Sequence, residues 1–111
     1  MLFSLTLEEV KIQEALGTLS NASFYTELHL TTDIEILRFV GLNSKCAKLR
    51  RAVSTSIYTP YSILRQMYKH DIDYYVRSNA WECIIKRYER RFGYPAPLHH
   101  RRKIFISNSS L

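Results

Sequence analysis

The strongest helical pattern in the chain lies in residues 79–93, which read NAWECIIKRYERRFG. Large apolar side chains recur there at i, i+3, i+4, i+7 and i+11, a spacing that lines one face of a helix. They are Trp81, Ile84, Ile85, Tyr88 and Phe92. Asn79 and Glu82 are typical of a helix start, and Gly93 is typical of the position just after a helix end. The stretch therefore predicts a helix over about 80–92 whose apolar stripe packs into a core.

Capping signals upstream predict that most of the chain is helical. The box Thr6-Leu7-Glu8-Glu9 begins a predicted helix over about 7–19, and Thr32-Asp33-Ile34-Glu35 begins another over about 33–40 that Gly41 ends. Asn43 is expected to cap a helix over about 44–54. Thr59-Pro60 places a cap before a proline at the first helical position, which predicts a helix that ends near His70.

Two short segments favour β-structure instead. Residues 24–30 alternate apolar and polar side chains, as a half-buried strand does, and residues 104–106 have the composition of an edge strand. The fold class is therefore predicted to be mainly α, a small helical bundle of four to five helices, with a short two-stranded β accessory left open. One helical domain is predicted over residues 1–98, followed by a basic C-terminal tail over 99–111. The predicted core consists of Ile36, Val40, Leu49, Val53, Leu64, Met67, Trp81, Ile84, Ile85 and Tyr88.

Length and composition exclude several classes of protein. With 111 residues, 46% hydrophobic and 23% charged, the chain resembles one globular domain rather than a disordered segment. No apolar run approaches the ~18 residues that a membrane span needs, and the N-terminus lacks the basic start of a secretory signal. We therefore expect an intracellular protein, cytoplasmic, nuclear or nucleoid-associated, without a membrane partner. Cys46 and Cys83 are expected to be reduced and buried, with a disulfide between them as the alternative.

Charge is divided unevenly along the chain. Residues 1–37 carry six carboxylates against one lysine, a net charge of −5, whereas residues 38–111 carry fifteen cations against four carboxylates, a net charge of +11. Such polarity indicates an anionic partner for the second part of the chain. The alternative is that the acidic part packs against the basic part and masks it.

The last predicted helix and the tail hold the densest group of cations. Phosphate binding requires several cations on one surface, and arginine adds a planar fork that grips two oxygens. The cations are Lys86, Arg87, Arg90, Arg91, Arg101, Arg102 and Lys103. The alternative is a solvated helix face in which Glu82 pairs with Lys86, or a surface that binds a protein.

Residues 33–54 match a helix-turn-helix in part. Two capped helices would meet at Gly41, and the second would present Ser44, Lys45 and Lys48 to a DNA groove, with Arg50 and Arg51 on phosphates. Two positions depart from that motif. Leu37 stands where a small residue normally lies, and Arg50 stands where an aliphatic residue is normally buried. Any helical hairpin with a glycine turn would give the same partial match.

Eight tyrosines offer stacking surfaces. Tyr74, Tyr75 and Tyr94 are predicted candidates for stacking on unpaired bases, as single-strand and RNA binders require. Tyr68 and Tyr88 lie on apolar stripes and are predicted to belong to the core. Because tyrosine is also favoured at protein interfaces, these residues do not separate the two kinds of partner.

The sequence contains no clear motif for a catalytic or metal site. Residues 70–73, His-Asp-Ile-Asp, and the cysteines and histidines elsewhere have no recognised metal-ligand or nuclease spacing, and no phosphate loop or nucleophile elbow occurs. We therefore predict no catalytic residues, no metal and no cofactor. The leading hypothesis is a non-enzymatic nucleic-acid-binding module, for DNA or RNA. The alternative is a small protein-binding module, an assembly subunit or virus-type inhibitor, that docks an acidic partner surface through tyrosine and arginine; a homodimer is left open.

Overall fold

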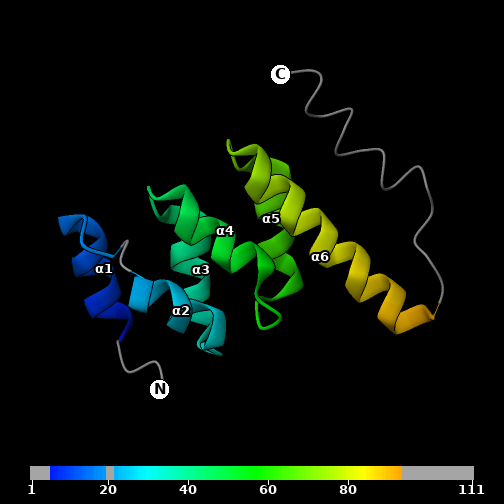
Figure 1. The fold of residues 1–111 in the computed structure, drawn as a ribbon, viewed down its shortest axis with the longest axis horizontal. Helices are drawn as coiled ribbons and strands as arrows, with labels where there is room; N and C mark the ends of the chain where they lie inside the picture. Colours follow the sequence, from blue (N-terminus) through cyan, green and yellow to red (C-terminus); the bar gives the residue numbers. More distant parts are fainter. Residues whose placement is uncertain (1–5, 20–21, 94–111) are drawn as a thin grey trace.

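The computed structural model of the chain describes residues 6–19 and 22–93 (Figure 1). These residues form six helices and no strand: α1 (Leu7–Leu16), α2 (Ala22–Leu30), α3 (Ile34–Asn43), α4 (Ala47–Thr55), α5 (Tyr61–His70) and α6 (Tyr74–Phe92). The prediction of a mainly helical bundle is confirmed, although six helices replace the four or five expected. The predicted edge strand at 104–106, the tail over 99–111 and the domain boundary at 98 lie outside the described residues.

The strand predicted over residues 24–30 is wrong, because these residues belong to α2. Phe24 and Leu28 are buried, whereas Thr26 and Leu30, which a strand would place on the same face, are exposed. Residues four apart share a face in a helix as well as in a strand. Seven residues of alternation therefore could not separate the two periods, and in the structure the segment is a helix that packs against α4.

Helix α4 is the centre of the bundle. It packs against α2, α3 and α6, and Figure 1 shows it between α3 and α6. Leu49, Ala52 and Val53 are almost completely buried along it. Since neighbours cover α4 on several sides, its remaining exposed surface is narrow.

Gly41 does not end α3, contrary to prediction. The helix continues to Asn43, and Gly41 lies buried inside it, where a Cβ atom would come within 2.8 Å of Val53 Cγ1 and 3.3 Å of Met67 Sδ. The glycine therefore allows α3 to approach α4 and α5 closely. The turn lies at residues 44–46 instead, and Cys46, not Asn43, precedes α4.

Helix α6 begins six residues earlier than predicted. Asp73 caps it, with Oδ1 accepting the Val76 N–H at 3.0 Å, so Asn79 and Glu82 lie in the helix interior. The predicted end of the preceding helix near His70 is confirmed, since Asp71, Ile72 and Asp73 separate α5 from α6. The predicted end is confirmed, since Gly93 has φ 74° and donates its N–H to the Glu89 carbonyl at 2.8 Å.

The remaining helix ends agree with their signals in part. Thr6 accepts the Glu9 N–H at 3.2 Å, as the capping box predicts. Helix α1 nevertheless stops at Leu16, because Gly17 adopts the left-handed conformation at φ 73°. Thr59 does not cap α5; its hydroxyl is buried and donates to the Val53 carbonyl at 2.7 Å. Pro60 is the residue that precedes α5.

The predicted core is confirmed except at its aromatic members. The eight aliphatic and methionine side chains of the prediction are buried, whereas Trp81 and Tyr88 are only half-buried and Phe92 is 48% exposed. One part of the apolar face of α6 therefore packs into the core, and another part lines a partly open groove. Cys46 and Cys83 are both free and half-buried, so no disulfide joins them.

Replacing Gly41 by alanine is expected to destabilise the protein. Alanine gains about 1 kcal/mol in helix propensity, but the contact of its Cβ with Val53 costs about 1–3 kcal/mol in a packed core. Urea unfolding of Gly41→Ala, Val53→Ala and the double variant measures both effects. The double variant should be more stable than the sum of the single changes implies. A stabilised Gly41→Ala protein, or strict additivity, would contradict close α3–α4 contact.

Candidate nucleic-acid interface

The described cations of the prediction fall into two regions, one on α4 and one on α6. Lys45 lies in the turn before α4 and Lys48, Arg50 and Arg51 lie in α4, whereas Lys86, Arg87, Arg90 and Arg91 belong to the last turns of α6. Tyr94, Arg101, Arg102 and Lys103 lie outside the described residues. The two regions differ in how far their side chains are already engaged within the fold.

Arg50 forms a forked ion pair with Asp71, in the turn between α5 and α6. Its Nε donates to Asp71 Oδ2 at 2.8 Å and its Nη2 to Oδ1 at 3.3 Å, while Nη1 donates to the Ser44 carbonyl at 2.8 Å. Only 11% of the Arg50 side chain and 7% of the Asp71 side chain are exposed. All three guanidinium nitrogens are therefore engaged inside the protein.

Arg51 forms a second, more exposed fork with Asp73. Nη2 donates to Asp73 Oδ2 at 2.9 Å and Nε to Oδ1 at 3.2 Å, and the guanidinium lies 4.9 Å from the centroid of the Tyr75 ring. The hydrogen bond from Arg51 lowers the pKa of Asp73, and the same bond raises the pKa of Arg51. Two predicted nucleic-acid contacts, Arg51 and Tyr75, thus pack against each other, and Tyr74 meets Tyr75 edge-on at 5.1 Å.

Little of helix α4 is exposed, since Lys48 and Thr55 are its exposed residues and Leu49, Ala52, Val53 and Ser54 are buried. Ser44 is 4% exposed, so the expectation that it faces a DNA groove is wrong. Lys45 and Lys48 are exposed, and Lys48 Nζ lies 5.1 Å from the centroid of the Tyr25 ring. A recognition helix must present several neighbouring side chains to the major groove. Of the three cations of α4, Lys48 is exposed and Arg50 and Arg51 are engaged with aspartates, so the helix does not present such a group.

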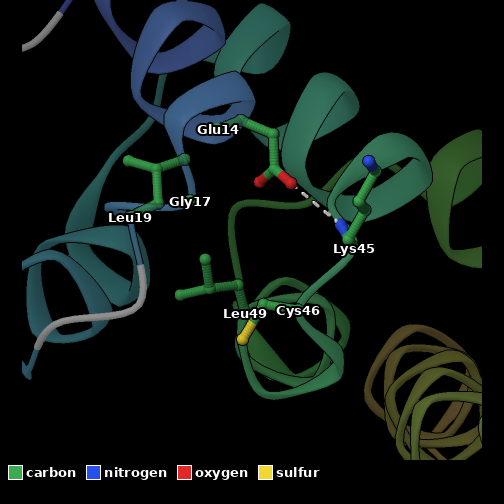
Figure 2. Close-up of a pocket in the computed structure, with 6 residues that line it drawn as sticks. All are labelled: Glu14, Gly17, Leu19, Lys45, Cys46 and Leu49. Atoms are coloured by element: carbon green, nitrogen blue, oxygen red, sulfur yellow. Dashed lines mark hydrogen bonds between the residues drawn. The ribbon is translucent and has the colours of Figure 1, made fainter.

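A small cavity of about 250 Å³ lies beside Lys45, between the end of α1 and the start of α4 (Figure 2). Glu14 Oε2 accepts the backbone N–H of Lys45 at 3.0 Å, and Figure 2 shows the lysine ammonium directed away from that carboxylate. Leu19, Cys46 and Leu49 contribute apolar surface. The contact ties α1 to the turn before α4, but the described lining of the cavity contains a single cation, Lys45.

A larger groove of about 610 Å³ lies between α5 and α6. We call it the α5–α6 groove. Its polar lining is mainly arginine, and most of the rest is aromatic. The residues are Tyr61, Arg65 and Tyr68 of α5 with Trp81, Ile84, Ile85, Arg87, Tyr88, Arg91 and Phe92 of α6. The volume is in the range of sites that hold a ligand, roughly 300–1,000 Å³.

The aromatic rings of the α5–α6 groove are arranged in pairs. Tyr68 and Trp81 stack with centroids 4.6 Å apart and planes at 26°, and Tyr88 lies 4.7 Å from Phe92. Tyr61 is 54% exposed and Phe92 48%. Trp81 Nε1 is buried and has no hydrogen-bond partner among the described residues. The groove thus offers open ring surface at its rim.

Within residues 6–19 and 22–93, the arginines of the α5–α6 groove do not take part in the ion pairs with carboxylates. Arg65 and Arg91 are exposed, and Arg91 lies 5.7 Å from the centroid of the Phe92 ring. Arg87 is half-buried and donates from Nη2 to the carbonyl of Ile57 at 3.2 Å. The ion pairs of the described residues involve other cations, Arg38, Arg50 and Arg51. The predicted pair between Glu82 and Lys86 is not among them, and Lys86 and Arg90 are exposed on the rest of α6.

Sequence reasoning missed much of this groove. Tyr68, Trp81 and Tyr88 were expected in the core, and Tyr61 and Arg65 were not singled out as site residues. A signal was present, because Tyr61, Arg65 and Tyr68 recur at i, i+4 and i+7 and share a face of α5. That spacing does not reveal whether the face meets a core or an open groove.

The acidic helix α1 does not cover α6. Figure 1 shows the two at opposite ends of the bundle, with α3 and α4 between them.

Among residues 6–19 and 22–93, no group of three or more His, Cys, Asp or Glu is placed to hold a metal ion. None of the helices described there is long and apolar enough to cross a membrane. A scan against protein-family models found no match, and comparisons with the curated proteins and the solved structures found none either.

Lowering the pH should reduce the free energy of unfolding, in part because Asp73 becomes protonated. Because its pKa is lowered in the folded state, its contribution to stability is present above the unfolded pKa of about 3.9 and is lost as the pH falls through the lower folded value. Asp73→Asn keeps an acceptor for the helix cap but removes the charge. Urea unfolding at pH 7, 5 and 3 should show a smaller acid-induced loss of stability in this variant than in the wild type.

Glu8→Gln provides the control for net charge, since it removes a carboxylate from the exposed surface of α1. If Asp73→Asn and Glu8→Gln lose stability between pH 5 and 3 to the same extent as the wild type, the Arg51–Asp73 pair has no part in acid sensitivity.

Proposed function

We propose that the protein is a non-enzymatic nucleic-acid-binding module that holds its ligand at the α5–α6 groove and along the exposed side of α6. One observation carries the proposal: Arg65, Arg87 and Arg91 line a groove whose other described lining residues are aromatic or aliphatic, without a carboxylate among them. A phosphate backbone needs such a group of cations, and arginine binds phosphate oxygens through its planar fork.

Cations beside the groove extend the same surface. Lys86 and Arg90 are exposed one helical turn apart on α6. Since an anionic polymer contacts many charges at once, cations outside the groove add affinity without having to converge on one point. In the sequence Arg101, Arg102 and Lys103 follow soon after α6, which adds three positive charges to this half of the chain.

The groove also supports the alternative of an acidic protein partner. Tyrosine, tryptophan and arginine are the residues most often found at the energetic centre of protein interfaces, and several of them line one concave surface here. The two functions differ in their response to salt. Nucleic-acid binding weakens log-linearly with salt in proportion to the phosphates contacted, whereas an interface anchored by aromatic rings weakens less.

Removing Arg65 and Arg91 should weaken nucleic-acid binding and its dependence on salt. Both side chains are exposed, so the double alanine variant should keep its fold, which circular dichroism checks. Fluorescence anisotropy with labelled single-stranded DNA, duplex DNA and structured RNA measures Kd at several salt concentrations. For the wild type we expect a log–log slope of about −4 or steeper, and for the variant a slope shallower by about 1.4 to 1.8.

Lys11→Ala/Arg38→Ala is the matched control, because it removes the same net charge from α1 and α3. It should leave the slope close to that of the wild type. Equal losses in the two double variants would show that net charge alone, and not the α5–α6 groove, determines binding. No binding by the folded protein at low salt would overturn the proposed function and favour the protein-binding alternative.

A further inference from the structure

We infer that the α5–α6 groove takes unpaired nucleotides, whose bases stack on its aromatic rings, so that the protein prefers single-stranded over duplex nucleic acid. The inference rests on the proposed function and specifies its ligand. It depends on where the aromatic rings lie relative to the arginines, because cations alone would bind either form.

The groove opens at the free end of a helical hairpin. Helices α5 and α6 pack together and are joined by a three-residue turn, but α5 has 10 residues and α6 has 19. The last turns of α6 therefore extend about 13 Å beyond the start of α5, and Figure 1 shows them projecting from the bundle. Tyr61 begins α5 and Phe92 ends α6, so the two most exposed rings of the groove lie toward this open end.

Rings and cations alternate along both walls. On α5, Arg65 stands between Tyr61 and Tyr68, and on α6 Arg91 stands directly before Phe92, with its guanidinium over that ring. This arrangement matches a chain in which charged phosphates alternate with flat bases. Single-strand binders combine these two elements, a cationic path for the backbone and aromatic side chains under successive bases.

A duplex cannot use the aromatic part of the groove. In a double helix the base faces are stacked on each other, and the outer surface consists of phosphates and sugars. Rings that line a concave surface can be reached only by a group that enters it. An unpaired base enters edge-first and exposes both faces, whereas a paired base must first leave its stack at a cost of a few kcal/mol.

The test compares probes that share phosphates but differ in their bases. A single-stranded oligonucleotide, its duplex and an abasic strand of equal length are titrated against the intact protein. We expect the base-bearing strand to bind roughly tenfold more tightly than the abasic strand. Trp81 is the single tryptophan of the chain and lies in the groove, so its fluorescence should change with the base-bearing strand and remain nearly constant with the abasic one.

Variants locate the effect in the rings. Tyr61→Ala and Phe92→Ala should lose affinity for the base-bearing strand by several-fold each while leaving affinity for the abasic strand unchanged. Tyr61→Phe and Phe92→Tyr keep a flat ring at each position and should bind as the wild type does. Both positions are about half exposed, so none of these changes opens a cavity in the core.

The outcomes separate this inference from the proposed function. Equal affinity for base-bearing and abasic strands, with the salt slope intact, would overturn base stacking and leave phosphate binding in place. Tighter binding of the duplex than of the single strand would likewise overturn base stacking and leave phosphate binding in place. No binding of any probe would overturn both.

Discussion

The structure depends on two adjacent arginines of α4 that pair with two aspartates of the α5–α6 turn. Arg50 with Asp71 and Arg51 with Asp73 fix the start of α6 against the middle of α4. The inner pair is almost completely buried, so the loss of either partner would leave an uncompensated charge in the core. Asp73 also caps α6 through the Val76 N–H. One short turn thus ends α5, begins α6 and holds both against the central helix.

The groove follows from this attachment at one end of α6. Helix α6 is anchored at its start and is longer than α5. The second half of its apolar stripe therefore extends beyond the part of α6 that α5 covers. Ile84 and Ile85 are buried beside α5, but Tyr88 is half-buried and Phe92 about half exposed. Arg87 holds this projecting half near the α4–α5 connection through its bond to the Ile57 carbonyl.

The features that could be predicted from the sequence are those that depend on residues close together in it. The Thr6 cap, the Gly93 end and the apolar stripe of α6 all depend on residues within about one to three helical turns of each other, and they were predicted from the sequence. The partners of Arg50 and Arg51 lie 21 and 22 residues away, and no spacing rule pairs them. Gly41 was misread for the same reason, since it serves contact with Val53 on another helix and not a turn. The α5–α6 groove required both helices to be placed before its lining could be recognised.

The ion pairs also determine how much of the positive charge counted in the sequence is available at the surface. The excess of positive charge over residues 38–111 suggests a uniformly basic surface, but Arg50 and Arg51 are committed to aspartates and Arg77 is buried, with Nη1 bonded to the Asp71 carbonyl. Among the described residues, exposed cations are therefore densest on the last turns of α6, at Lys86, Arg90 and Arg91 with Arg65 on α5, while Lys45, Lys48 and Lys69 are exposed elsewhere. The acidic helix α1 lies at the opposite end of the bundle. Charge division along the sequence thus becomes charge division in space, and under the proposed function this field would turn an anionic polymer toward α6 before any contact forms.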